Sequence, residues 1–418
     1  MTPLEIYDIP GDKSISHRAI IIGALTSGVT TFNGFLCSED CLNTLKIFRQ
    51  LGVKIELKGT QVQVHGTGVT GLKSPSEILD VGNSGTGIRL IAGALSGSQI
   101  SATLTGDHSI QKRPMGRILE PLLKMGASIT ANDNVPPLNV QGSKLKANVS
   151  YKMPIASAQV KSAVLLAACA SEIPVTVIEP ELCRDHTERM LRLFGATVQT
   201  ESGQIKLVQP RLTAPLNEVQ IPSDISSALF FICLTLMKNR NVIFKNIGLN
   251  ESRIGCLAVL EQMGVDLSVK QFLHQYEPMG DIHIHPSSKR KNIEIPEDII
   301  PNVIDELPIL SMLALTQPGT LKVRGAEELR VKESDRIAGI CRLATALGAD
   351  VVEYRDGFDI TAPEKPASEI KFDAHYDHRL AMSALIITKA FNIKAEITGL
   401  ESISTSFPNF SALLEQLF

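Results

Sequence analysis

Two short segments place cationic and hydroxyl residues directly before an apolar, helix-like stretch. Residues 11–18, Gly-Asp-Lys-Ser-Ile-Ser-His-Arg, carry Lys13 and Arg18. Residues 82–89, Gly-Asn-Ser-Gly-Thr-Gly-Ile-Arg, carry three glycines. Backbone N–H groups at a helix start favour anions, and glycine lets a ligand approach the backbone closely. Both segments therefore indicate binding of a phosphate or a carboxylate, although helix capping by its serines is an equally good interpretation of the first.

The second half of the chain places more acidic residues at similar points. Residues 329–336 hold five charges in eight residues, a run that often forms only a solvated surface. The acidic pair 305–306 and the triplet 377–379, Asp-His-Arg, each precede an apolar stretch. Arg379 at a helix start is electrostatically unfavourable unless an anion or an acid compensates it. This placement favours a functional role for Arg379.

Other patterns narrow the class of site. Arg113 and Arg184 add guanidinium groups that could hold a carboxylate or phosphate through two hydrogen bonds. The spacing of a P-loop, a dinucleotide fingerprint and a Ser/His/Asp order are all absent from the sequence. His283 and His285 alternate along one strand face without a third ligand nearby, which argues against a metal. The combination predicts a site for small polyanionic substrates.

Composition excludes several classes of protein. The 418 residues suffice for two or three domains, and 41 basic against 44 acidic residues give no basic excess for nucleic acid. The longest strongly apolar run, 228–237, is too short to cross a bilayer, and residues 1–10 do not resemble a secretory signal. Seven scattered cysteines fit reduced thiols. We therefore expect a cytoplasmic protein.

A repeated pattern runs through the whole chain. An apolar residue, a glycine and a further apolar residue recur after helix-like stretches, which predicts five helices ending at Gly52, Gly126, Gly195, Gly264 and Gly348. A strand-like segment precedes each of these helices and a sixth, C-terminal one; the six segments are 28–32, 98–104, 174–178, 241–245, 319–323 and 394–398.

Six units of about 70 residues fill the chain and combine helix with strand, which predicts an α/β fold. The sequence Ile-Pro-Gly-Asp at 9–12 is matched by Ile-Pro-Ser-Asp at 221–224. This match predicts two homologous domains of three units each, 11–221 and 1–10 plus 222–418, with hinges near residues 10 and 222.

These motifs, in this order, resemble the EPSP synthase family, the 3-phosphoshikimate 1-carboxyvinyltransferases. The resemblance covers essentially the whole chain, and 330–336, Arg-Val-Lys-Glu-Ser-Asp-Arg, is its most specific part. Residues 157–162 and 184–188 are similar to the bacterial subgroup that includes herbicide-tolerant members. The other segments that carry the resemblance are 11–18, 82–86, 113–115 and 377–379.

The resemblance implies two domains, each with three βαβαββ-type units in an inside-out α/β barrel, which close on ligand. It implies transfer of the enolpyruvyl group of phosphoenolpyruvate to the 5-hydroxyl of 3-phosphoshikimate by addition and elimination. The products would be 5-enolpyruvylshikimate 3-phosphate and phosphate, in the biosynthesis of chorismate and aromatic amino acids. We expect inhibition by glyphosate, a monomer, no cofactor and no metal, and neither nucleic acid nor membrane as a partner.

The resemblance also assigns binding residues. For 3-phosphoshikimate it implies Lys13, Ser14, Arg18, Ser157, Ala158, Gln159, Arg184, Asp305 and Lys332. For phosphoenolpyruvate it implies Lys13, Gly85, Arg113, Gln159, Arg336 and Arg379.

The chemistry requires a base for the 5-hydroxyl, an acid for the methylene carbon, and cations for the accumulated negative charge. Asp305 and Glu333 are the candidates for acid and base. We expect Asp305 to be the base, with Glu333 or Lys13 transferring the proton at carbon. Arginine suits the charge-holding role because it stays protonated.

Three positions depart from the family pattern. Asp12 stands where relatives often carry serine, a change expected to be peripheral, and Thr405 stands where many carry a lysine for phosphoenolpyruvate. Tolerant relatives carry alanine at the position of Gly85, so Gly85 predicts sensitivity to glyphosate.

Two other functions are considered. The first is the UDP-N-acetylglucosamine enolpyruvyl transferase family, which shares the expected fold and the donor phosphoenolpyruvate. Its members carry a catalytic cysteine in the first half, in a region where this chain has no cysteine between Cys41 and Cys169. A non-catalytic anion-binding repeat protein would bind without turnover, and it would leave Asp305 and Glu333 with no role beyond helix capping.

Overall fold

The computed structural model describes residues 3–272, 276–287 and 290–417, which form two compact units. Unit 1 contains the chain up to Pro10 and most of it from Pro222 onward, whereas unit 2 contains Gly11–Ile221. Unit 2 also includes Tyr276 and Glu277, which the sequence analysis assigned to the other domain. The physical reason is a pair of contacts between residues far apart in the sequence: the Tyr276 hydroxyl donates to the carbonyl of Gln220 at 3.1 Å, and Glu277 is hydrogen-bonded to His186.

Unit 2 contains three helices that are buried along nearly their whole length. These helices have buried residues on all sides, as expected for helices inside a domain, and their ranges are α1 (Lys13–Leu25), α3 (Gly85–Ser96) and α5 (Ala158–Ala170). The others carry an exposed polar face: α2 (Glu39–Gln50), α4 (Gly116–Lys124) and α6 (His186–Leu193). A short 3-10 helix, η1 (Ile110–Lys112), precedes α4.

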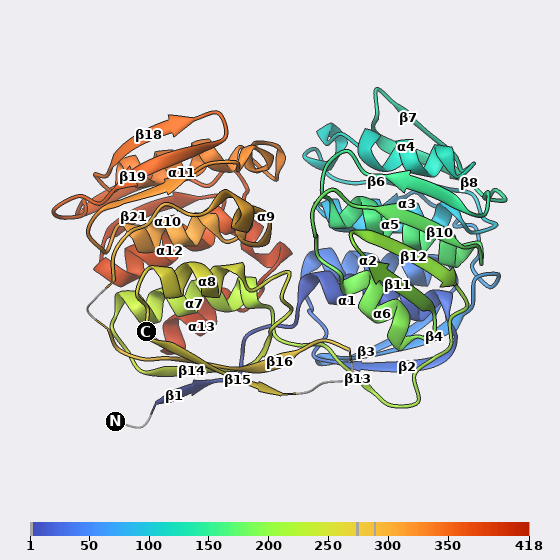
Figure 1. Ribbon diagram of the computed structural model, residues 1–418, viewed down its shortest axis with the longest axis horizontal. Coiled ribbons are helices and arrows are strands. Elements are labelled where there is room, and N and C mark those ends of the chain that lie inside the picture. Colours follow the sequence, from blue (N-terminus) through green and yellow to red (C-terminus); the bar gives the residue numbers. More distant parts are fainter. Residues whose placement is uncertain (1–2, 273–275, 288–289, 418) are drawn as a thin grey trace. The chain divides into compact units, whose positions relative to one another are not determined.

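Three four-stranded sheets surround these helices in the described part of unit 2. Figure 1 shows α1, α3 and α5 lying between the β2–β4 and β6–β8 strands. The first sheet has the order β13 (Val219–Gln220), β2 (Ser27–Asn33), β4 (Gln61–Thr67), β3 (Lys54–Lys58). The second is β5 (Leu79–Asp80), β6 (Ala102–Thr105), β8 (Val135–Gln141), β7 (Ser128–Asn132). The third is β11 (Thr197–Glu201), β12 (Gln204–Gln209), β10 (Val175–Ile178), β9 (Val149–Lys152).

Unit 1 repeats the plan. Its buried helices α7 (Ile225–Met237), α10 (Leu307–Ala314) and α12 (His378–Phe391) lie between the β14–β16 strands and the strands β18 and β19 (Figure 1). The remaining helices are α8 (Gly255–Gln262), α9 (Ile300–Val303), α11 (Arg336–Ala346), α13 (Phe410–Leu417), η2 (Glu297–Ile299), η3 (Glu327–Val331) and η4 (Leu400–Thr405). The sheets are β1 (Leu4–Ile6), β14 (Val242–Gly248), β16 (Met279–Ile284), β15 (Leu267–Phe272); β17 (Thr320–Val323), β19 (Gly357–Thr361), β18 (Asp350–Tyr354); and β20 (Glu369–Asp373), β21 (Lys394–Thr398).

The repeat predicted from the sequence is confirmed element by element. All five glycines at the predicted helix ends have positive φ, between +84° and +90°, a conformation that other residues adopt only with strain. The six predicted strand segments overlap β2, β6, β10, β14, β17 and β21, although β2, β6 and β14 extend beyond the predicted bounds. The sixth unit ends with α13, so its sheet has only two described strands.

Gly93 allows two helices that carry predicted site residues, α3 and α5, to pack closely. A Cβ at Gly93 of α3 would lie 2.4 Å from the carbonyl oxygen of Ala163 in α5, so only glycine permits this contact. The first turns of these helices carry Gly85 and Gln159. The close packing therefore fixes two predicted binding residues relative to each other.

Candidate active site

The start of α1 carries Lys13 and is capped by an aspartate. The Oδ1 atom of Asp12 accepts from the backbone N–H of Ile15 at 2.9 Å. The cap is therefore Asp12 rather than Ser14 or Ser16, because the helix begins at Lys13, two residues earlier than capping by Ser14 requires. Asp12 is also buried, so its position is not peripheral in the fold. Lys13 Nζ lies 2.5 Å from Asp40 Oδ2, which fixes the direction of the ammonium group.

A second group of predicted residues gathers where α3 and α5 begin. The amide of Gln159 donates to Thr86 Oγ1 at 3.0 Å and accepts from Arg89 Nη1 at 2.8 Å. Arg113 points toward the same turn, since a Cβ at Gly85 would lie 2.6 Å from its Nη1. The structure therefore brings Gly85, Arg113 and Gln159 together, as binding of one substrate requires. Ser157 caps α5 by accepting from the Val160 N–H at 3.4 Å.

Arg18 and Arg184 complete the predicted set in unit 2. Arg18 is buried and hydrogen-bonded to Ser162 of α5 and Thr187 of α6. Arg184 is half-buried, two residues before α6. The described part of unit 2 thus presents cations on or beside α1, α3, α5 and α6.

In unit 1 the predicted residues surround Arg336, the first residue of α11. Its Nε lies 2.8 Å from Asp377 Oδ2, its Nη2 2.5 Å from Glu333 Oε2 and its Nη1 3.3 Å from Asp305 Oδ1. Arg336 is 1% exposed. Burial opposes its charge, but Asp377, Glu333 and Asp305 outweigh burial and raise the pKa of Arg336.

The two predicted proton-transfer carboxylates remain accessible beside these cations. The side chains of Asp305 and Glu333 are 13% and 19% exposed, and Lys332 Nζ lies 3.6 Å from Asp305 Oδ1. Arg379 Nη1 donates to the carbonyl oxygen of Asp305 at 2.7 Å. All five predicted residues of unit 1 therefore form one cluster around Asp305.

Of the two groups expected to compensate Arg379, an anion or an acid, the structure places an acid there, Glu306. Its Oε1 lies 3.8 Å from Arg379 Nη1 and is hydrogen-bonded to the Ser226 hydroxyl, which also accepts from Arg253 Nη2 at 2.6 Å. Asp377 is a second residue whose role as the partner of Arg336 was not foreseen. Asp377 lies in the motif 377–379, which indicated a functional role, but Arg336 lies 41 residues away in the sequence, so the motif did not show this pairing.

Residues in the charged run 329–336 have two roles, since some support the fold and others form part of the site. Arg330 pairs with Asp335 at 2.7 Å and with Glu353 at 2.9 Å, so these residues support the fold. Lys332 and Arg336 face Asp305 instead, and Glu333 pairs with Arg336.

Thr405 ends a short 3-10 helix in unit 1. Its hydroxyl donates to the carbonyl of Ser402 at 2.7 Å, within the same turn. Threonine carries no charge, so Thr405 cannot replace the lysine that many relatives have at this position. That phosphoenolpyruvate binding lacks a cation here stays a prediction.

His17, inside the first motif, supports the fold and not the ligand. Its Nδ1 is 2.8 Å from Thr44 Oγ1 and its Nε2 3.4 Å from Ser84 Oγ, so it links α1, α2 and the start of α3. Burial, with Lys13 and Arg18 adding repulsion, holds the pKa of His17 well below 6.5.

We expect this histidine to destabilise the fold in acid. Unfolded His17 takes up a proton below pH about 6.5 whereas the folded residue does not, so the free energy of unfolding falls as pH falls, by up to about 1.4 kcal/mol per pH unit. Urea titrations from pH 7 to 5 should show this slope and its loss in His17→Asn. His375→Asn, at a half-exposed histidine, is the control and should keep the slope. An equal slope in wild type and His17→Asn would contradict the assignment.

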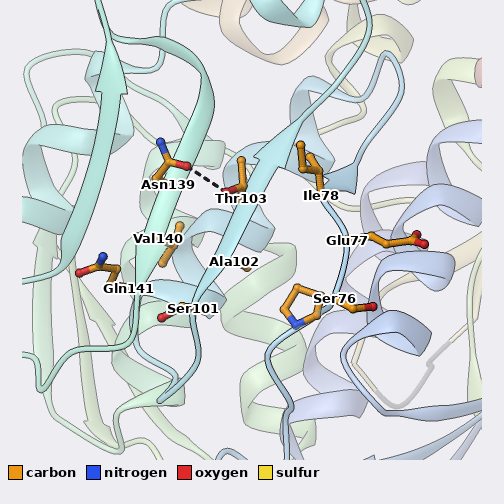
Figure 2. Close-up of a pocket in the computed structure, with 10 residues that line it drawn as sticks. Ser76, Glu77, Ile78, Ser101, Ala102, Thr103, Asn139, Val140 and Gln141 are labelled. Carbon is orange, nitrogen blue, oxygen red and sulfur yellow. Dashed lines mark hydrogen bonds between the residues drawn. The ribbon is translucent and has the colours of Figure 1, made fainter.

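Figure 2 shows a pocket outside these clusters. It has a volume of about 350 Å³ and is lined by residues 75–78, 101–103 and 139–141, with Thr103 hydrogen-bonded to Asn139. None of the predicted site residues lines it. In the part of the chain that the structure describes, no group of three His, Cys, Asp or Glu side chains is arranged so that it could hold a metal ion, and no helix has the length and apolarity to cross a membrane.

Comparison with solved structures identifies the class. The chain superposes on the EPSP synthase from Acinetobacter baumannii with a TM-score of 0.85 at 42% identity, covering 99% of this chain and 96% of that one. The enolpyruvyl transferase NikO from Streptomyces tendae has a TM-score of 0.78 at 15% identity, covering 100% and 94%, a likeness of fold alone. The predicted enolpyruvyl transferase fold is thus confirmed.

Sequence relatives narrow the class to one family. The chain is 44% identical over 413 residues to the 3-phosphoshikimate 1-carboxyvinyltransferase of Bacillus cytotoxicus, covering 98% of this chain and 96% of that protein. It is 43% identical over 424 residues to the enzyme of the same name from Leptospira interrogans, covering 98% and 96%. The family model of EPSP synthase (3-phosphoshikimate 1-carboxyvinyltransferase) matches residues 5–414, and the chain belongs to this family. The predicted enzymatic function is confirmed by this membership.

Proposed function

We propose that this chain performs the family reaction through the two clusters described above. Lys13, Arg18 and Arg184 of unit 2, with Lys332 of unit 1, would hold 3-phosphoshikimate, together with Ser14, Ser157, Ala158, Gln159 and Asp305. Phosphoenolpyruvate would be held by Lys13, Gly85, Arg113, Gln159, Arg336 and Arg379. The observation that supports this most strongly is the cluster of Asp305 with Arg336 at 3.3 Å and Lys332 at 3.6 Å, an accessible carboxylate among cations.

Each step has a residue of suitable chemistry. Asp305 takes the proton of the 5-hydroxyl, whose oxygen then attacks the carbon of phosphoenolpyruvate that carries the phosphate. Glu333 or Lys13 delivers a proton to the methylene carbon, which becomes a methyl group. The same residue then takes one methyl proton back as phosphate leaves with the electrons of its C–O bond, which completes the transfer. The arginines stabilise the negative charge of both substrates and of the departing phosphate.

Phosphate release by the purified protein tests this function. We expect release only when phosphoenolpyruvate and 3-phosphoshikimate are both present, and at the same rate with a chelator added, because arginine and lysine carry the charge in the proposed mechanism. Binding of both substrates without phosphate release would instead favour another acceptor or a binding role.

Gly85 leads us to propose sensitivity to glyphosate. A Cβ in Gly85→Ala would lie 2.6 Å from Arg113 Nη1 and 3.0 Å from Arg89 Nη1, so both guanidinium groups must shift. We expect wild-type inhibition at concentrations near the KM for phosphoenolpyruvate. In Gly85→Ala, inhibition should weaken by about tenfold or more, the equivalent of about 1.4 kcal/mol, with a smaller rise in this KM. Gly116→Ala is the control, because its Cβ would meet nothing nearer than 3.8 Å. A wild-type inhibition constant far above the KM would refute the proposal.

The two units, with the hinges near residues 10 and 222, would act as the closing domains, because each carries part of the proposed binding set. Since one chain holds the whole set, we propose that it acts as a monomer. The seven free cysteines support a place in the cytoplasm.

A further inference from the structure

The guanidinium group of Arg18 is held by three hydrogen bonds inside unit 2. Its Nε donates to Thr187 Oγ1, its Nη2 to Ser162 Oγ and its Nη1 to the carbonyl oxygen of Ser14, each at 2.7 Å. Arg18 is 3% exposed, and neither Ser162 nor Thr187 is exposed at all. A guanidinium has five N–H donors, so two remain for a ligand.

The two hydroxyls form a network with only one consistent set of proton positions. Ser162 Oγ lies 2.6 Å from the carbonyl oxygen of Ala158, which can only accept, so Ser162 donates its single proton there. The 2.7 Å bond between Ser162 and Thr187 must then be donated by Thr187. Both hydroxyl oxygens are left to accept from Arg18. Both hydroxyl protons are used, and the same network fixes the carbonyl of Ala158 in the first turn of α5.

All three acceptors are neutral, and this distinguishes Arg18 from Arg336. In the described residues Arg336 pairs with three carboxylates, whereas Arg18 pairs with two hydroxyls and a backbone carbonyl. Burial, only partly offset by the more distant charges of Glu188, Asp12 and Glu277, lowers the pKa of Arg18 to about 10, so it stays charged at neutral pH. Its charge is therefore available to a doubly negative phosphate.

A buried ion pair next to the hydroxyls holds the two helices in place. Lys161, adjacent to Ser162, has its Nζ 2.7 Å from Oε1 of Glu188, which is adjacent to Thr187. Lys161 Nζ also lies 2.8 Å from Glu179 Oε2, and these three side chains are at most 2% exposed. Breaking such a pair is strongly unfavourable, so the spacing of α5 and α6 around Arg18 is rigid.

We propose that Ser162 and Thr187 are positioning residues that orient Arg18 for 3-phosphoshikimate without neutralising it. The inference rests on the proposed binding of this substrate by Arg18. The two hydroxyls orient the guanidinium group through hydrogen bonds but carry no charge, so the positive charge of Arg18 stays available to the ligand. A carboxylate partner would neutralise that charge.

Steady-state kinetics of Thr187→Val and Ser162→Ala test the proposal. Each substitution removes one acceptor of Arg18 with little change in volume. We expect the KM for 3-phosphoshikimate to rise about tenfold in each, as for loss of a hydrogen bond to a charged group, and further in the double variant. The kcat and the KM for phosphoenolpyruvate should change no more than in the controls. Thr187→Ser should restore the wild-type KM, which a merely structural defect would not predict.

Matched controls come from unit 2 itself. Thr26→Val and Ser96→Ala remove buried hydroxyls that donate to a carbonyl of their own helix, at 2.7 Å in each case. If Thr187→Val does not fold, Ser162→Ala carries the same test. A KM for 3-phosphoshikimate that rises no more than in the controls overturns the proposal.

Arg18→Lys separates this outcome from failure of the proposed function. If Arg18→Lys raises the KM for 3-phosphoshikimate and the hydroxyl variants do not, only the positioning role is wrong. If Arg18→Lys leaves that KM unchanged, the assignment of Arg18 to 3-phosphoshikimate is wrong, and the positioning role with it.

Discussion

Replacing Asp305 by asparagine is expected to lower kcat by about 10²- to 10⁴-fold, the usual effect of removing a general base. Asparagine keeps the shape of the side chain but cannot take up the proton of the 5-hydroxyl. It also removes a negative charge that lies 3.3 Å from Arg336 and 3.6 Å from Lys332. Those cations then attract anions more strongly, so the KM for phosphoenolpyruvate should stay the same or fall.

The measurement is steady-state turnover together with the binding of each substrate. Asp298→Asn is a matched control, since Asp298 is exposed in the short helix η2 seven residues earlier, and it should retain wild-type turnover. Turnover of Asp305→Asn within a few-fold of wild type, with substrates still bound, would show that another group is the base. The same assay on Glu333→Gln and Lys13→Met decides which of these two delivers the proton to carbon. Because Lys13 is also a proposed binding residue, kcat is compared at saturating concentrations of both substrates, where only the residue responsible should lose turnover to a comparable extent.

Replacing Arg336 by methionine is expected to destabilise the protein by about 3–5 kcal/mol, because it leaves buried carboxylates without their cation. Asp377 is fully buried, and Asp305 and Glu333 share the same guanidinium. Arg336→Lys should recover part of this stability but little of the activity, since one ammonium group cannot reproduce the planar contacts to three carboxylates. Urea unfolding followed by circular dichroism measures the first effect, and kcat/KM for phosphoenolpyruvate the second.

Arg324→Met is the control, because that arginine is paired with Asp359 at 2.9 Å near the surface and should cost at most about 1 kcal/mol. Equal losses in the two variants would contradict the role given to Arg336.

The sequence could predict the elements because their signals are local. A glycine after an amphipathic stretch predicts a helix end, and in the structure each of these glycines has a positive φ. The apolar strand segments that precede these helices repeat in the same order. The motifs at helix starts could also be predicted to bind anions, since the N-terminal N–H groups of a helix are a property of the helix itself.

Partner choice could not be predicted in this way. Arg18 meets Thr187 across 169 residues, and Arg336 meets Asp377 across 41, and no local pattern shows which acid or hydroxyl each arginine will find. The inclusion of Tyr276 and Glu277 in unit 2 was missed for the same reason, since it depends on contacts with Gln220 and His186.

The two ends of the segment that forms unit 2 lie next to each other, and this bears on how the fold arose and how it can be engineered. The strand β13, at the end of the segment 11–221, pairs in parallel with β2 near its start, and a Cβ at Gly11 would lie 3.4 Å from a methyl carbon of Ile221. In unit 1, the carbonyl of Pro10 accepts from the N–H of Asp224 at 2.8 Å, so the flanking chain is also joined. A segment whose two ends meet has the geometry of one module inserted into a loop of another. Such a module tolerates circular permutation, because a short linker suffices to connect its original ends.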